Sequence, residues 1–126
     1  MAEQNETGKT GEAVACSYLE INGYKVLKTN WHHGHYEIDI VATDGKDIVI
    51  VEVKTRSINY LVPPEQAIDN AKINRLAAAA EAYVRINRCD MPIRFDVILL
   101  VKDGDAYTVE EHIEDAFYPP VKYKRF

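Results

Sequence analysis

The chain has 126 residues, 47% of them hydrophobic and 28% charged, a balance that fits one globular domain and excludes extensive disorder. Its formal net charge of −5 excludes a uniformly basic surface, although it leaves room for a local basic patch. The sequence shows neither a long apolar run nor a secretion signal, and its two cysteines have no metal or redox spacing. We therefore expect a cytoplasmic protein with reduced thiols and no membrane span.

The first part of the chain predicts one helix followed by three strands. An apolar stripe at helical spacing places the helix from about Gly8 to Asn22, and Gly23 stands where helices commonly end. Runs rich in β-branched and aromatic residues follow, the last two of them joined by an Asp-Gly hairpin signal. The predicted strands are residues 24–30, 36–43 and 47–55.

The second part predicts another helix and two more strands. Pro63-Pro64 is expected to open the helix, because proline is favoured at the first helical position, and Gln66 to Asn87 has high helix propensity. The strands are residues 94–101 and 106–113. The order of the predicted elements is αβββαββ, an alternation of helices and strands that indicates an α/β fold. We expect one domain over residues 1–116 and a flexible basic tail over residues 117–126.

The predicted strand 47–55 carries two charges where a sheet is usually apolar. Side chains alternate faces along a strand, so Glu52 and Lys54 share a face with two isoleucines, where a charge is costly to bury without a partner. If the hairpin loop has two residues, Asp39 lies directly opposite Glu52 on the neighbouring strand. The same register puts Glu37 opposite Lys54.

Two opposed carboxylates repel each other, and each raises the pKa of the other. Beside a lysine they are poorly suited to a structural role but well suited to a hard divalent cation such as Mg²⁺, which takes oxygen ligands. The lysine would then orient or deprotonate an attacking water, or stabilise charge on a phosphate. The alternative is a Glu37–Lys54 cross-strand ion pair, with Asp39 and Glu52 merely solvated.

Four stretches of the chain carry a resemblance to a known family. They are Gly8-Lys9-Thr10-Gly11-Glu12, Glu37-Ile38-Asp39-Ile40-Val41-Ala42, Val51-Glu52-Val53-Lys54-Thr55-Arg56 and Arg94-Phe95-Asp96-Val97. Asp39, followed after a hairpin by Glu52-Val53-Lys54, resembles the PD-(D/E)xK nuclease signature, and the order of the first six elements is the core of that superfamily. More closely, the chain resembles the YraN family of uncharacterised bacterial proteins, predicted endonucleases distantly similar to archaeal Holliday junction resolvases.

The resemblance implies a restriction-endonuclease-like fold, in which a mixed sheet is flanked by helices, and a site for Mg²⁺ or Mn²⁺. Asp39 and Glu52 would hold the metal, assisted by the backbone carbonyl of Val53, and Lys54 would be the catalytic lysine. Glu12, on the first helix, would match a resolvase-like glutamate that completes the acidic cluster. Considered without the resemblance, Glu12 is an ordinary acidic residue in the first turn of a helix.

Contacts to nucleic acid are predicted for six side chains outside the metal site. Two of them fall on one face of the second predicted helix, where a solvated surface is the alternative. Two others belong to a histidine-rich loop that lacks the companions of a zinc site and would touch phosphate when protonated. The six are Lys9, His33, His35, Arg56, Lys72 and Arg75.

Two further features have structural interpretations. Trp31 would stack on a base only as the weaker alternative, because an aromatic residue of this kind more often packs in a core or at a strand edge. Arg94 and Asp96 share a strand face, and we expect them to pair with each other or with a neighbour.

The sequence therefore predicts an Mg²⁺- or Mn²⁺-dependent endonuclease that acts on DNA, including branched or otherwise structured DNA. A homodimer would suit a two-fold symmetric substrate. The alternative is a nucleic-acid-binding or protein-interaction module that keeps the nuclease fold without cleaving, and the acidic net charge favours this alternative. Neither a glycine-rich phosphate loop nor a Ser-His-Asp arrangement supports another enzyme class.

Overall fold

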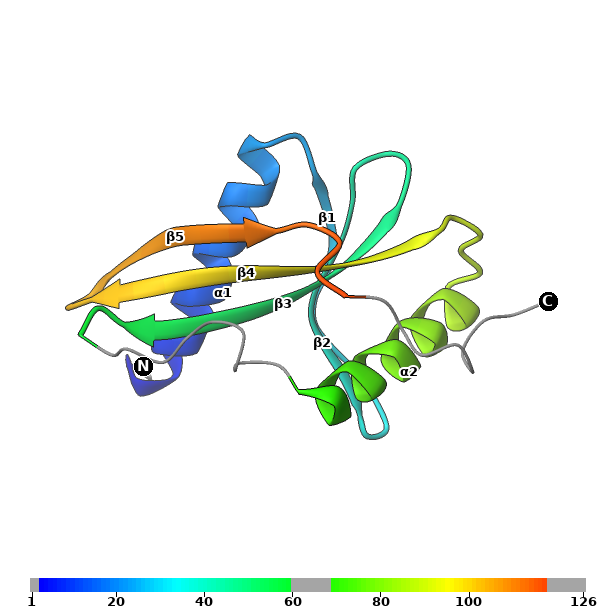
Figure 1. Ribbon diagram of the computed structural model, residues 1–126, viewed down its shortest axis with the longest axis horizontal. Helices are drawn as coiled ribbons and strands as arrows, with labels where there is room; N and C mark the ends of the chain where they lie inside the picture. The colour runs from blue at the N-terminus through cyan, green and yellow to red at the C-terminus, as the bar shows by residue number, and fades with distance from the viewer. Residues whose placement is uncertain (1–2, 60–68, 118–126) are drawn as a thin grey trace.

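Within the part of the chain that the structure describes, five strands and two helices form an α/β fold in the predicted order αβββαββ (Figure 1). The computed structural model describes residues 3–59 and 69–117, and side chains from Thr10 onward. The elements are α1 (Glu3–Ile21), β1 (Lys25–His33), β2 (Tyr36–Thr43), β3 (Ile48–Ser57), α2 (Asn70–Ile86), β4 (Ile93–Asp103) and β5 (Ala106–Ile113). Neighbouring strands are antiparallel except β3 and β4, which are parallel and flank α2 in the sequence.

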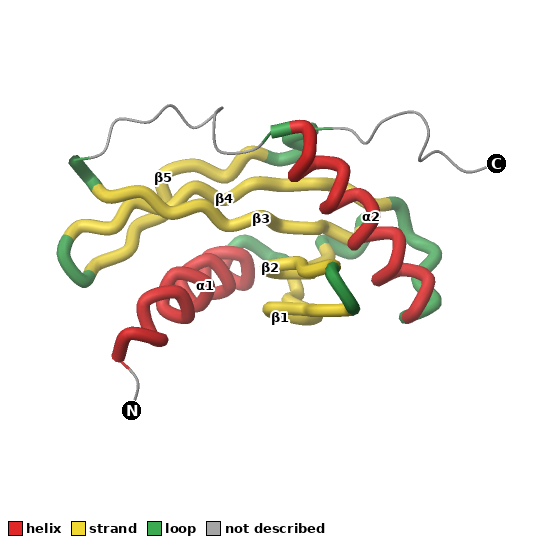
Figure 2. Tube along the Cα trace, turned by 90° about the horizontal axis from the view of Figure 1, so that it is seen from below, coloured by secondary structure: helices red, strands yellow, loops and turns green. Residues whose placement is uncertain are grey.

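The sheet has one helix on each face, and each helix covers its own core. In Figure 1, α1 lies behind the sheet and α2 in front of it, and Figure 2 shows the same separation from below. On the α1 face, Ala15 and Leu19 pack against Val49, Val51 and residues of the neighbouring strands. On the α2 face, the core contains Ile48, Ile50, Leu76, Ala80, Tyr83 and Phe95. The alternation predicted for β3 is therefore confirmed, and Glu52 belongs by parity to the α2 face.

Both helices end or begin at recognisable caps. The predicted stop of α1 is confirmed, because Gly23 has a φ of +93° and the Tyr24 N–H donates to the Leu19 carbonyl at 2.9 Å. α2 begins at Asn70, later than the predicted helical run from Gln66, of which residues 66–68 lie outside the described residues. Asp69 is the N-cap, and its side chain accepts a hydrogen bond from the Lys72 N–H at 2.9 Å. The proline pair that was expected to open this helix lies outside the described residues.

The hairpin between β2 and β3 has the predicted register. Ile40 pairs with Val51 and Thr43 with Ile48, which is the alignment that puts position 39 opposite position 52. The connection is a compact turn rather than a bare two-residue loop. Asp44 shapes it, because its Oδ1 accepts from the backbone N–H groups of Lys46 and Asp47, both at 2.9 Å.

Other boundaries also differ from the sequence-based expectation. β1 continues to His33, so two of the histidines predicted to lie in a loop belong to a strand and only the Gly34-His35 turn separates it from β2. α1 begins at Glu3 rather than near Gly8. Phe117, assigned by prediction to the tail, stacks on Phe95 with ring centroids 5.2 Å apart, while residues 118–126 lie outside the description.

The described helices include none that is both long and apolar enough to cross a membrane. Cys16 and Cys89 are half-buried free thiols.

Candidate metal centre

The predicted catalytic strand positions meet where β2 leaves β3. Cross-strand pairing between these strands stops at Ile40 and Val51. Beyond this pair, a side chain takes the place of the β2 backbone as hydrogen-bond acceptor for β3. The Asp39 Oδ2 accepts a hydrogen bond from the Val53 N–H at 2.9 Å. The N–H and C=O of one strand residue point to the same edge of the strand, so the Val53 carbonyl faces the gap that Asp39 enters.

Glu52 is one of two charged side chains that are buried in the described part of the chain, with 5% of its surface exposed. Its Oε2 lies 3.3 Å from the Lys72 Nζ and 3.5 Å from the Lys54 Nζ. Burial raises the pKa of Glu52, and the charge of Asp39 raises it further, while both lysines oppose the shift. We call Asp39, Glu52, Lys54 and Lys72 the Glu52 site.

Asp39 has a similar electrostatic environment. Burial raises the pKa of its carboxyl above the ordinary value, and the hydrogen bond from Val53 and the charge of Lys72 only partly offset that effect. The raised pKa values of these two neighbouring carboxyls mean that keeping both of them ionised costs free energy in the folded protein. A cation that binds between them would remove that cost.

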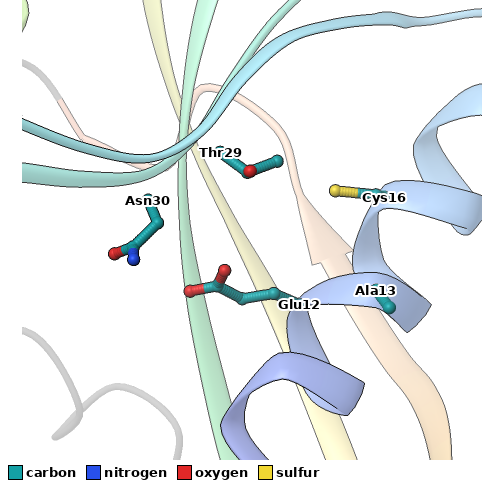
Figure 3. Close-up of a pocket in the computed structure, with 5 residues that line it drawn as sticks. All are labelled: Glu12, Ala13, Cys16, Thr29 and Asn30. Atoms are coloured by element: carbon teal, nitrogen blue, oxygen red, sulfur yellow. The ribbon is translucent and has the colours of Figure 1, made fainter. Parts of the chain in front are cut away.

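Glu12 approaches the same region from α1. Its carboxylate lines a cavity of about 320 Å³ between α1 and β1 (Figure 3). Burial raises the pKa of Glu12, followed by the charges of Asp39 and Glu37, so Glu12 and Asp39 are electrostatic neighbours. Within the described residues, however, no three His, Cys, Asp or Glu side chains lie close enough together to hold one metal ion.

The alternative Glu37–Lys54 pair is not the arrangement seen. Glu37 lies beside the β1 residue His32, with Oε1 3.7 Å from Nδ1, and Lys54 turns instead to Glu52. The cross-strand pairing of β1 and β2 matches this, because His32 and Glu37 are register partners.

The side chains predicted to contact nucleic acid are spread over three regions. Lys72 belongs to the Glu52 site, and Arg75 is exposed one turn further along α2. Arg56 forms two hydrogen bonds with Glu110 on β5, at 2.9 and 3.2 Å. His33 stacks on Trp31 at the far end of β1, and His35 occupies the exposed turn. The structure does not describe the side chain of Lys9.

Trp31 is half-buried and packs against the core on the α2 face, in agreement with its structural interpretation. Its ring meets that of Tyr83 on α2 edge to face, with centroids 5.3 Å apart.

The contact between Lys72 and Glu52 was not predicted, although its signal is present in the sequence. The apolar stripe of α2 includes Leu76, Ala80 and Tyr83, and Lys72 stands one turn before Leu76 on the same stripe. A lysine at the end of a core-facing stripe must find a buried acid or reach water. Helical spacing alone thus places Lys72 over the sheet, but it does not say which carboxylate lies beneath.

A second polar cluster lies on the α1 face, and prediction found only part of it. Arg94 and Asp96 pair as expected, through bonds of 2.9 Å from Nε and 2.8 Å from Nη2. His112 Nε2 also contacts the Asp96 carboxylate, at 2.7 Å. Tyr24 accepts from Arg94 at 2.6 Å, and the Tyr18 hydroxyl lies 3.0 Å from His112 Nδ1. We call these five residues the Asp96 network.

Comparison with known proteins agrees with the family indicated by the sequence. The model of the uncharacterised protein family UPF0102, the YraN family, matches residues 11–100. The chain belongs to this family. A UPF0102 protein of Parabacteroides distasonis is 50% identical over 97% of this chain and all of its own length. UPF0102 proteins of Bacteroides thetaiotaomicron and Porphyromonas gingivalis are 47% and 41% identical over 96% and 99% of this chain, and over 99% and 92% of their own lengths. The match to the family model includes Glu12 and the whole Glu52 site.

Proposed function

We propose that this UPF0102 protein is a metal-dependent nuclease that hydrolyses phosphodiester bonds in DNA. The observation that carries the proposal is the junction of β2 and β3, where Asp39 reaches the Val53 backbone and the buried Glu52 lies beside two lysines. Buried acids with raised pKa values do little for stability, and such groups concentrate at functional sites.

The donor set fits Mg²⁺ or Mn²⁺. Two carboxylates and the Val53 carbonyl are all oxygen ligands, the kind that hard divalent cations prefer. Asp39 and Glu52 would hold the ion, and Glu12 would support it from across the cavity. When bound, the ion supplies a Lewis acid and lowers the pKa of a coordinated water.

The lysines prepare the site for a phosphate. In the Glu52 site two carboxylates balance two ammonium groups, so a divalent cation leaves it positively charged. That charge favours a phosphodiester, which carries one negative charge. Lys54 would assist the nucleophile or stabilise the developing charge, and Lys72 would hold a phosphate oxygen. Arg75 continues the basic surface along α2 and would contact the next phosphate of the backbone.

The test is cleavage of labelled duplex, single-stranded, flapped and four-way-junction DNA with Mg²⁺ or Mn²⁺. We expect the wild type to cut at least one of them, and Asp39→Ala and Lys54→Ala to reduce cleavage about 1000-fold or more. Asp103→Ala and Lys102→Ala are the matched controls, because they remove one acid and one lysine at the far end of β4. Cleavage that survives both site substitutions would refute the assignment.

A second function is a nucleic-acid-binding module that does not cleave. Two observations favour it: the lysines already lie 3.3 and 3.5 Å from Glu52 and offset part of its charge, and the described residues include no three-ligand metal group. Binding of one of these DNAs without cutting, with either metal, would select this function. The absence of both cutting and binding would exclude both.

A further inference from the structure

The cavity between α1 and β1 has no role in the proposed reaction beyond the contribution of Glu12. It measures about 320 Å³, near the lower end of the range for ligand pockets. The residues that line it are Glu12, Ala13, Cys16, Thr29 and Asn30. Figure 3 shows the Glu12 and Asn30 side chains pointing into the same space, with the Cys16 sulfur directed toward Thr29.

Asn30 places this cavity beside the candidate metal ligands. Thr29 pairs with Ile40 and Trp31 with Ile38, so Asn30 lies across from Asp39 in the β1–β2 register. Its φ is +51°, a left-handed conformation that asparagine tolerates better than most residues and that costs free energy within a strand. Its side-chain Oδ1 is held 3.0 Å from His32 Nε2. Strained residues cluster at functional sites, so the position of Asn30 opposite a candidate ligand supports a role for it there.

The described lining favours one class of ligand over another. None of the five described lining residues is a lysine or arginine, and the carboxylate of Glu12 would repel a phosphate. The polar groups are instead a carboxylate, a carboxamide and a hydroxyl, which together accept and donate hydrogen bonds. Nucleobase edges carry exocyclic amines that donate and ring atoms that accept, and a site of this size suits one base rather than a duplex.

We propose that the cavity binds one unpaired nucleobase next to the phosphate that is cut, so that the substrate class is DNA with a single-stranded or branched segment. The proposal rests on the proposed function for the presence of DNA at the Glu52 site. A paired base must leave its stack to enter such a pocket, at a cost of a few kcal/mol, and an unpaired base pays least. The cavity would therefore select for structure rather than for sequence.

The test is the affinity for three DNAs of the same sequence, measured by fluorescence anisotropy with Ca²⁺ in place of Mg²⁺. The first is a duplex, and the second is the same duplex with a single-stranded flap. The third is a set of flapped DNAs, each with one abasic site at a different nucleotide near the branch. Thr29→Val removes the hydroxyl, and Asn30→Gly removes the amide while permitting the positive φ. Thr108→Val is the matched control, an exposed threonine on the opposite edge strand β5.

We expect the wild type and Thr108→Val to bind flapped DNA about tenfold more tightly than duplex, as a single bound base commonly contributes. One abasic position should abolish that preference, and Thr29→Val and Asn30→Gly should reduce it. Equal affinity for all three DNAs, no binding, or a preference that survives every abasic position and both variants would overturn the proposal. The nuclease proposal fails separately. Preference without cleavage refutes the nuclease alone, and cleavage without preference refutes the base pocket alone.

Discussion

Glu52 and Asp96 are the two buried charged residues in the described part of the chain, and they differ in how well the surrounding groups stabilise their negative charges. Glu52 faces α2 and has a raised pKa, while Asp96 faces α1 and has a lowered one. Burial acts to raise the pKa of both carboxyls. For Asp96, hydrogen bonds from His112 and Arg94 and from the Asp115 N–H more than compensate for burial. For Glu52, the neighbouring charge of Asp39 adds to burial, and the lysines do not fully offset the two effects.

The comparison shows why burial of a charge does not identify a functional site by itself. The Asp96 network surrounds one carboxylate with donors and ties α1 and the loop after it to β4 and β5. Such a network rigidifies a fold. The Glu52 site instead brings a second acid close to the first and leaves part of the electrostatic cost unmet. The difference predicts that changes in the network will affect stability and that changes in the site will affect activity.

The largest expected loss of stability follows Asp96→Ala. Removing this carboxylate leaves the Arg94 guanidinium without its main partner on a half-buried strand position. Loss of one partner of a buried pair typically costs about 3–5 kcal/mol of the free energy of unfolding. Urea denaturation followed by circular dichroism measures this change. Glu110→Ala is the control, because it breaks the exposed pair with Arg56, and it should have a much smaller effect. Equal losses in the two variants would contradict the comparison.

Glu52→Gln should have the opposite effect on stability. Because the pKa of Glu52 is raised, the folded state binds the proton more tightly than the unfolded state. Stability is therefore lost as the pH rises above the ordinary value of 4.5 toward the folded pKa. Glutamine removes that loss, so we expect the free energy of unfolding at pH 7 to increase by about 0.5–2 kcal/mol, the gain that single stabilising substitutions commonly give.

The pH dependence separates the two carboxylates. The gain from Glu52→Gln should disappear below pH 4.5, where Glu52 is protonated in both states. Asp96 has a lowered pKa, so its contribution is present at neutral pH and is lost as the pH falls below the ordinary value of 3.8. Denaturation curves at a series of pH values test both signs. A gain from Glu52→Gln that persists at pH 3 would show that its origin is not electrostatic.

Lys72→Gln should change metal binding and DNA binding at the Glu52 site in opposite directions. The ammonium group 3.3 Å from Glu52 competes with a cation, so its removal is expected to tighten Mn²⁺ binding about fivefold. The same variant should weaken DNA binding, because it would remove the phosphate contact that we propose for Lys72. Calorimetry and anisotropy measure the two affinities. Arg75→Gln, on an exposed part of the same helix, is the control and should leave Mn²⁺ affinity unchanged.

The smallest expected effect is that of Gly11→Ala. Gly11 is a buried helical residue beside Glu12, and an added Cβ would lie 3.4 Å from the Tyr107 ring and 3.5 Å from Leu100, ordinary contact distances. Alanine has a higher helix propensity than glycine, so the free energy of unfolding should rise by about 0.5–1 kcal/mol. Thermal unfolding measures it. A lower free energy of unfolding would contradict this expectation. It would show that α1 packs against the sheet too closely to accept a Cβ at position 11.

Much of the fold could be predicted because its signals are local. The bounds of β2 and β5 agree with the expected strands, and the β2–β3 register follows from a short hairpin and side-chain alternation. The start of α2 could not be located from proline preference alone, because the capping side chain of Asp69 determines where the first helical hydrogen bonds begin. The histidine segment was expected to be a solvated loop because it lacks the companions of a zinc site, although pairing with β2 continues through it.

The sequence by itself determined which residues share a face, which acids lie across a hairpin, and to which family the chain belongs, because these depend on short-range geometry and residue identity. Only the tertiary structure decided which distant groups meet. Tyr18 and His112 are 94 positions apart, and Lys72 reaches Glu52 only because α2 crosses the sheet at that point. The cavity beside Glu12 depends in the same way on how α1 lies against β1. Periodicity fixes the direction of a side chain from its own element, but packing between elements sets what it encounters.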